Sequence, residues 1–126
     1  MDANDLKGKT GFKRLVNALG YSKDGIVAAF RSEEAFRQES LLALILIPIA
    51  LMIPVELSLR LLAIFSVFFV LVTELLNSGI EAAIDRIGPE LHPKSKFAKD
   101  VASAAVLMSL SFAAIVWIVV LTCWLY

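Results

Sequence analysis

Residues 66–86 read SVFFVLVTELLNSGIEAAIDR, and within this stretch an apolar run gives way to a polar one. The apolar part belongs to a longer segment, Leu57 to Leu76, whose only charged residues are Arg60 and Glu74. A helix needs roughly 20 mainly apolar residues to cross the hydrocarbon core of a bilayer. The stretch therefore predicts a helix that crosses a membrane and then continues into water with acidic side chains.

Two further apolar segments flank this one. Leu41 to Val55 reaches the spanning length only if its helix begins near Glu34 to Gln38, and it contains Pro48, which lipid-embedded helices tolerate. Val101 to Tyr126 ends in aromatic residues, which favour the membrane–water boundary. The chain is 59% hydrophobic, above the usual range of soluble domains. We expect one all-α membrane domain over residues 1–126, with helices at 34–55, 57–87 and 97–126 carrying three transmembrane spans.

Basic residues are distributed unevenly around the three segments, which predicts the topology. Most of them precede the first span or separate the second from the third, and only Arg60 lies between the first and second. Cytoplasmic loops carry the excess of lysine and arginine, so the N-terminus and the second connection are expected in the cytoplasm and the C-terminus outside. Formal net charge is zero, which argues against a nucleic-acid partner. The two basic groups are Lys7, Lys9, Lys13, Arg14, Lys23, Arg31 and Arg37, and then Arg86, Lys94, Lys96 and Lys99.

Residues 10–32 form an amphipathic region before the first span. Apolar residues recur at helical spacing from Phe12 to Leu19, a turn signal follows at Ser22 to Gly25, and the pattern resumes at Ile26. We expect two short helices in the plane of the lipid headgroups, with lysines and arginines on the opposite face. The alternative is an ordinary amphipathic helix packed against other protein.

The most informative feature is a polar stripe on the second span. At about 100° per residue, Glu74, Asn77, Ser78, Glu81 and Asp85 share one face of a helix. A solvated helix end explains Asp85 but not Glu74, because an ionised carboxylate inside the hydrocarbon costs at least ~2.5–3.5 kcal/mol. We therefore predict that Glu74 and Glu81 bind a ligand or accept a proton. Stacked oxygen ligands of this kind suit Mg²⁺.

Other charged groups reach the same membrane boundary. Residues 33–39 place acids before the first span, and Lys99 with Asp100 lies at the start of the third. His92 and Cys123 are the only histidine and cysteine, so a transition-metal centre is not expected. No P-loop motif is present. Phosphoryl transfer needs positioned substrates, a metal on the phosphates, cations and a base for the attacking hydroxyl. Arg14, Lys99, Asn77 and the acids are of the types that can bind the metal and fill the other roles.

Several motifs together resemble the prokaryotic diacylglycerol kinases. Residues 74–86 resemble the family signature E-x-x-N-[ST]-x-x-E-x-x-x-D, and residues 35–39 read AFRQE. Further matches are Gly11-Phe12-x-Arg14, Ala18-x-Gly20-Tyr21-Ser22, Ala98-Lys99-Asp100 and Ser103-Ala104-Ala105-Val106. The resemblance covers nearly all of the chain after Thr10.

The resemblance implies a homotrimer in the bacterial inner membrane, with active sites at the cytoplasmic boundary shared between subunits. It implies a lipid kinase that transfers the γ-phosphoryl group of ATP to diacylglycerol with Mg²⁺, giving phosphatidic acid. Glu74 resembles the general base, and Glu33 and Glu81 resemble the metal ligands. The ATP-binding positions implied are Arg14, Tyr21, Glu33, Asn77, Glu81, Asp85, Glu90, His92, Lys99 and Asp100. The lipid-binding positions implied are Arg14, Ala18, Tyr21, Ser22, Lys23, Ala35, Glu39, Glu74, Ser103 and Trp117.

Three alternatives remain open from the sequence. An undecaprenol kinase shares this fold and differs in its lipid. A small proton-coupled transporter also uses an intramembrane acid, but it places that acid near the midplane, whereas Glu74 and Glu81 lie toward one end of their span. A non-catalytic membrane subunit leaves the polar stripe unexplained. Glu34 adjoins Glu33 and is a second possible metal ligand, and Pro48 has no evident chemical role.

Overall fold

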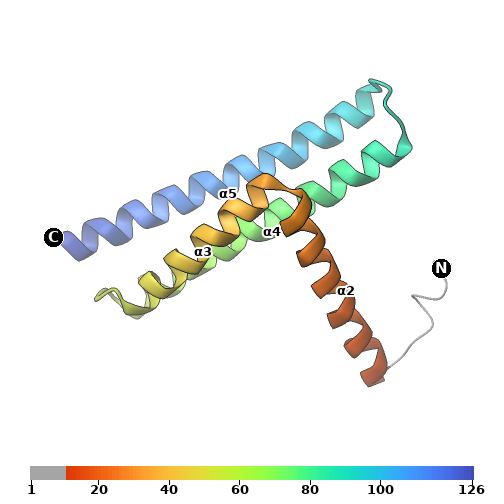
Figure 1. Ribbon diagram of the computed structural model, residues 1–126. Coiled ribbons are helices and arrows are strands. Elements are labelled where there is room, and N and C mark those ends of the chain that lie inside the picture. The colour runs from red at the N-terminus through yellow and green to blue at the C-terminus, as the bar shows by residue number, and fades with distance from the viewer. Residues whose placement is uncertain (1–10) are drawn as a thin grey trace.

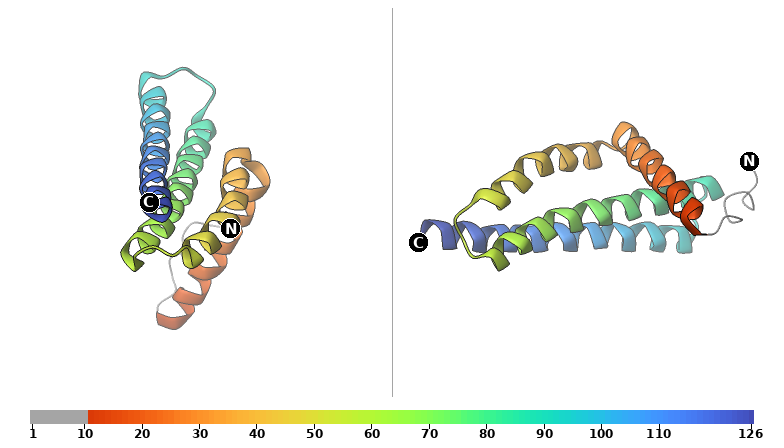
Figure 2. Two further views of the ribbon diagram at one scale, coloured as in Figure 1. Left: turned by 90° about the vertical axis from the view of Figure 1, so that its left-hand side faces the viewer. Right: turned by 90° about the horizontal axis from the view of Figure 1, so that it is seen from below.

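The computed structural model describes residues 11–126 as four helices joined by short connections (Figure 1). They are α2 (Gly11–Ser32), α3 (Glu34–Met52), α4 (Leu57–Ile87) and α5 (Pro93–Leu125), and this described part contains no strand. Helices α3, α4 and α5 run alongside one another, with α4 in contact with both of the others. Helix α2 leaves this bundle at a steep angle (Figures 1 and 2). The all-α class is confirmed.

Three of these helices are long and apolar enough to cross a membrane, as predicted: α3, α4 and α5. Helix α4 has 31 residues and α5 has 33. At about 1.5 Å per residue, each exceeds the roughly 30 Å thickness of a hydrocarbon core. Both helices are therefore longer than a perpendicular crossing requires, and the charged residues around the α4–α5 connection lie at one end of them.

Helix α2 is continuous, so the predicted break between two short helices is wrong. Gly20 and Gly25 lie inside the helix, and neither has a positive φ. A glycine inside a helix costs about 1 kcal/mol relative to alanine, which lowers helix propensity without ending the helix. Its last turn contacts the bundle, whereas its N-terminal end lies away from it (Figure 2). Lys7, Lys9 and residue 10, which entered the topology and surface-region predictions, lie outside the described residues.

The other helix boundaries differ from the predicted ones by a few residues. Helix α5 begins at Pro93 and not at residue 97, because proline fits the first position of a helix, where its missing N–H is not needed. The backbone N–H of Lys94 donates to Nδ1 of His92, which caps the helix. Helix α3 continues through Pro48 and ends at Met52, two residues before Pro54.

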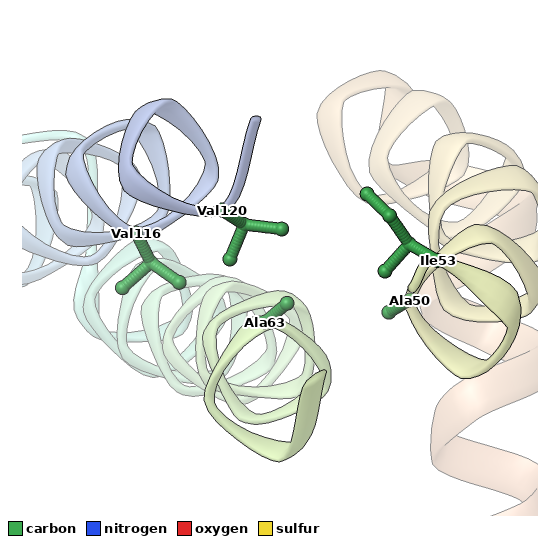
Figure 3. Close-up of a cluster of buried hydrophobic side chains, with 5 residues drawn as sticks. All are labelled: Ala50, Ile53, Ala63, Val116 and Val120. Carbon is green, nitrogen blue, oxygen red and sulfur yellow. The ribbon is translucent and has the colours of Figure 1, made fainter. Parts of the chain in front are cut away.

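Small and β-branched side chains pack the end of the bundle opposite the α4–α5 connection. The buried cluster consists of Ala50, Ile53, Ala63, Val116 and Val120, contributed by α3 with its C-cap, α4 and α5 (Figure 3). Ala50, Ala63 and Val120 have no exposed surface at all. Small residues let helix backbones approach closely in a membrane, where packing and not water exclusion drives association. The cluster therefore fixes how the three spanning helices meet.

We expect Ala63→Leu to destabilise the fold by about 1–3 kcal/mol, because the added atoms overpack a site with no free volume. The measurement is reversible unfolding by a denaturing detergent in micelles. Ala83→Leu, on an exposed face of the same helix, is the matched control and should change stability by about 0.5 kcal/mol or less. Equal effects of the two substitutions would contradict this packing.

Candidate active site

Glu74 is the buried acid of the polar stripe. Only 7% of its surface is exposed, and it faces α3, where Glu39 lies within hydrogen-bonding reach. Two carboxyl groups can form a hydrogen bond only if one of them carries a proton. Two acids this close together at a buried position mark Glu74 as a candidate functional group. Glu39 Oε2 is buried and has no hydrogen-bond partner among residues 11–126.

One turn further along α4, Asn77 orients Glu81. Asn77 Nδ2 donates to Glu81 Oε1 at 3.3 Å, and both side chains are half-buried. Asn77 Oδ1 is buried without a partner in the part of the chain that the structure describes. A buried acceptor of this kind is costly unless a ligand or water donates to it. Glu81 is therefore held in place beside an acceptor that is free to bind a ligand.

The predicted nucleotide-binding residues near the α4–α5 connection gather around one cavity. Its volume is about 310 Å³, and its lining includes Asp85, Glu90, His92, Lys99 and Asp100. Lys99 Nζ donates to Asp85 Oδ1 at 2.7 Å and so joins the two helices across it. The cavity combines cationic and acidic groups, which suits a polyphosphate with its metal.

Glu33 lies at the junction of α2 and α3, where it is half-buried and precedes the first residue of α3. With Ser22 it lines a groove of about 580 Å³ between α2 and α4, which also includes Ser78 and Gly79. Within residues 11–126, no three histidine, cysteine or acidic side chains come close enough to hold a metal ion. Mg²⁺ is often bound by only one or two carboxylates, with phosphate and water as its other ligands, and Glu33 and Glu81 are carboxylates of that kind.

An apolar cavity of about 220 Å³ lies over α4, between α3 and α5. Glu39 lies at one end of it and Trp117 is part of its lining, with aliphatic residues such as Leu42 and Val67 between them. The indole Nε1 of Trp117 is buried without a hydrogen-bond acceptor among the described residues. This cavity suits a hydrocarbon chain with a polar group near Glu39.

The structure does not gather every predicted site residue within one chain. Arg14 is exposed near the N-terminal end of α2, the end that lies away from the bundle (Figures 1 and 2). Five other predicted residues are exposed and line none of the three cavities described above: Ala18, Tyr21, Lys23, Ala35 and Ser103. A single chain thus brings together the acids of α4, the Lys99 cavity and the apolar cavity, but not Arg14.

One buried polar contact beside the site was not predicted from the sequence. Thr73 Oγ1 and Ser109 Oγ lie 2.8 Å apart between α4 and α5, and both residues are buried. A usable signal exists in the sequence, because Ala102, Ser109 and Val116 recur every seven residues within an apolar run. Small or hydroxyl residues at such spacing indicate a helix–helix interface in a membrane. The partner of Ser109 on α4 does not follow from that spacing.

Comparison with known proteins identifies the family. Residues 20–121 match the family model of prokaryotic diacylglycerol kinases. A diacylglycerol kinase from Pseudomonas aeruginosa is 47% identical over 121 residues, which cover 96% of this chain and 98% of the relative. One from Escherichia coli K12 is 47% identical over 89% of this chain and 92% of the relative, and one from Helicobacter pylori is 48% identical over 85% and 84%. The chain belongs to the prokaryotic diacylglycerol kinase family.

Proposed function

We propose that this protein phosphorylates diacylglycerol with ATP, using Glu74 as the general base and a Mg²⁺ ion bound by Glu33 and Glu81. Lipid kinase activity on diacylglycerol follows from family membership, and so does the use of ATP with a divalent metal. One observation carries the assignment of roles. Glu74 is buried beside Glu39, which lines the apolar cavity, and the polar stripe that begins at Glu74 ends at Asp85 in the lining of the Lys99 cavity.

Glu74 is suited to take the proton of the lipid hydroxyl. It is buried beside a second carboxyl group and adjacent to a cavity for hydrocarbon. As the hydroxyl proton passes to the Glu74 carboxylate, the lipid oxygen forms a bond to the γ-phosphorus. The bond from that phosphorus to the β–γ bridging oxygen breaks, and ADP leaves. A positioned base of this kind contributes roughly 10²–10⁴-fold to a rate.

Mg²⁺ is the metal that fits Glu33 and Glu81. Mg²⁺ prefers hard oxygen ligands and is often bound by one or two carboxylates together with substrate phosphates. The hydrogen bond from Asn77 holds Glu81 in one orientation before the metal arrives. When bound, the ion neutralises charge on the phosphoryl group. Lys99, already at the cavity edge, supplies a further cation.

We infer further that the protein is a homotrimer whose active sites are shared between subunits. The number three is what the family resemblance implies. The support for shared sites is the position of Arg14, which is exposed on the end of α2 that points away from its own bundle. A cation there reaches nucleotide phosphates only if it serves the site of a neighbouring copy. The amphipathic α2 then lies along the inner membrane surface, and the α4–α5 connection faces the cytoplasm.

The direct test is transfer of radioactive phosphate from ATP to short-chain diacylglycerol in detergent micelles, with undecaprenol assayed in parallel. We expect Mg²⁺-dependent formation of phosphatidic acid and little product from undecaprenol. Phosphorylation of undecaprenol alone would overturn the assigned substrate, and no transfer to either lipid would overturn the activity.

We expect Glu74→Gln to lower kcat by about 10²-fold or more, because an amide cannot accept the proton. The substitution keeps the size of the side chain, so elution in size-exclusion chromatography should not change. Steady-state kinetics measure the effect. Turnover near the wild-type rate would remove Glu74 from the role of base.

We expect Glu81→Ala to raise the Mg²⁺ concentration needed for half-maximal activity by about tenfold or more, since even the loss of an outer-shell partner of a metal ligand typically costs about 10–100-fold in metal affinity. The matched control is Glu34→Ala, an exposed acid next to Glu33 whose carboxylate accepts from Gln38. It should leave the Mg²⁺ titration unchanged. If Glu34→Ala shifts the titration and Glu81→Ala does not, the assignment of the metal ligands is wrong.

A further inference from the structure

A hydroxyl pair joins α4 to α5 directly beside the proposed base. Thr73 Oγ1 and Ser109 Oγ are 2.8 Å apart, with 8% of Thr73 and none of Ser109 exposed. Both residues are covered by their own chain, so the contact does not depend on another subunit. Thr73 immediately precedes Glu74.

Both hydroxyl protons of the pair have hydrogen-bond acceptors. Thr73 Oγ1 also lies 2.9 Å from the carbonyl oxygen of Val70, and Ser109 Oγ lies 2.8 Å from that of Val106. Each hydroxyl has one proton and can accept as well as donate. One hydroxyl donates to the other, which in turn donates to the carbonyl in its own helix. Either direction keeps the link between the helices.

The link fixes the rotation of α4 about its own axis. Successive helical residues point about 100° apart, so a Thr73 directed at α5 leaves Glu74 directed toward α3. Glu74 does face Glu39 of α3. A slip of α4 by one residue along α5 moves Glu74 by about 1.5 Å and turns it away from this position.

No other buried side-chain hydrogen bond joins α4 to α5 within residues 11–126. The other side-chain hydrogen bond between α4 and α5 in this part of the chain runs from Lys99 to Asp85 and is exposed near the connection between the two helices. Exposed ion pairs contribute little because water and salt screen them. A hydroxyl pair in a low-dielectric interior is electrostatically stronger than the same pair in water. The Thr73–Ser109 bond is therefore the directional contact that aligns these helices at the level of Glu74.

We propose that Thr73 and Ser109 are positioning residues that hold Glu74 in its catalytic orientation. The inference rests on the proposed role of Glu74 as base. When one hydroxyl is removed, the other still has a carbonyl acceptor in its own helix, so no buried donor is left without a partner. An effect of the pair on turnover can therefore be separated from an effect on packing.

The test compares substitutions that separate the hydroxyl from the shape of the side chain. Thr73→Val keeps the shape and removes the hydroxyl, whereas Thr73→Ser keeps the hydroxyl and removes the methyl group. We expect Thr73→Val and Ser109→Ala each to lower kcat about tenfold, since small misplacements of a catalytic group carry large kinetic costs. KM for MgATP and for diacylglycerol should stay within about twofold, and Thr73→Ser should restore most of kcat.

A double variant and a control complete the experiment. Thr73→Val combined with Ser109→Ala should be no slower than the slower single variant, because both remove the same bond. Ser66→Ala is the matched control, since Ser66 is fully buried on α4 and its hydroxyl bonds only to the carbonyl of Ala63. It should retain wild-type kcat.

Three results would overturn the proposal: unchanged kcat in Thr73→Val and Ser109→Ala, multiplied effects in the double variant, or equal losses in Ser66→Ala. If Thr73→Val does not fold, Ser109→Ala and its rescue by Ser109→Thr carry the same comparison. Failure of the proposed function is recognised separately, because the wild-type protein would then transfer no phosphate to diacylglycerol.

Discussion

An ionised carboxylate inside hydrocarbon is costly, and Glu74 is the acid that this chain buries at the end of an apolar span. The arrangement around it follows from the need to hold this group in one position. Helix α3 places Glu39 against it, and α5 is bonded to the neighbouring Thr73. Small residues such as Ala63 let the helices approach closely enough for these contacts. The packing of the spanning helices therefore sets the geometry of the site, because a shift of one helix along another also displaces Glu74.

The two substrates differ in chemistry, and we propose separate surroundings for each. The apolar cavity that Glu39 and Trp117 line is formed by α3, α4 and α5, whereas the cavity at Lys99 lies at the α4–α5 connection, where charged residues gather. The polar stripe of α4 connects the two. A reaction between a lipid hydroxyl and a water-soluble nucleotide needs such a meeting point at the membrane surface, and an acid at the midplane does not provide one.

Much of this could be predicted from the sequence, since hydropathy and helical period are local properties. The length of the apolar runs predicted three spanning helices, and the spacing from Glu74 to Asp85 predicted one polar face. The predicted break in α2 was wrong because glycines weaken a helix without ending it. The predicted start of α5 at residue 97 was four residues late, because Pro93 fits the first position of a helix. Contacts between helices, such as Glu39 with Glu74 and Thr73 with Ser109, depend on axial register, which a single sequence does not encode locally. The roles of the individual site residues remain proposals.

We propose that the acids of α4 meet water at the inner face of the membrane beside a bound nucleotide. Labelling of Ala82→Cys with a membrane-impermeant maleimide, in a Cys123→Ser background, tests this most directly in sealed vesicles of known orientation. Ala82 is exposed and adjoins Glu81, and Cys123 is the only native cysteine. We expect labelling from the cytoplasmic side alone, at a rate that MgATP lowers. Labelling only from the external side, or no labelling from either side in intact vesicles, would contradict it.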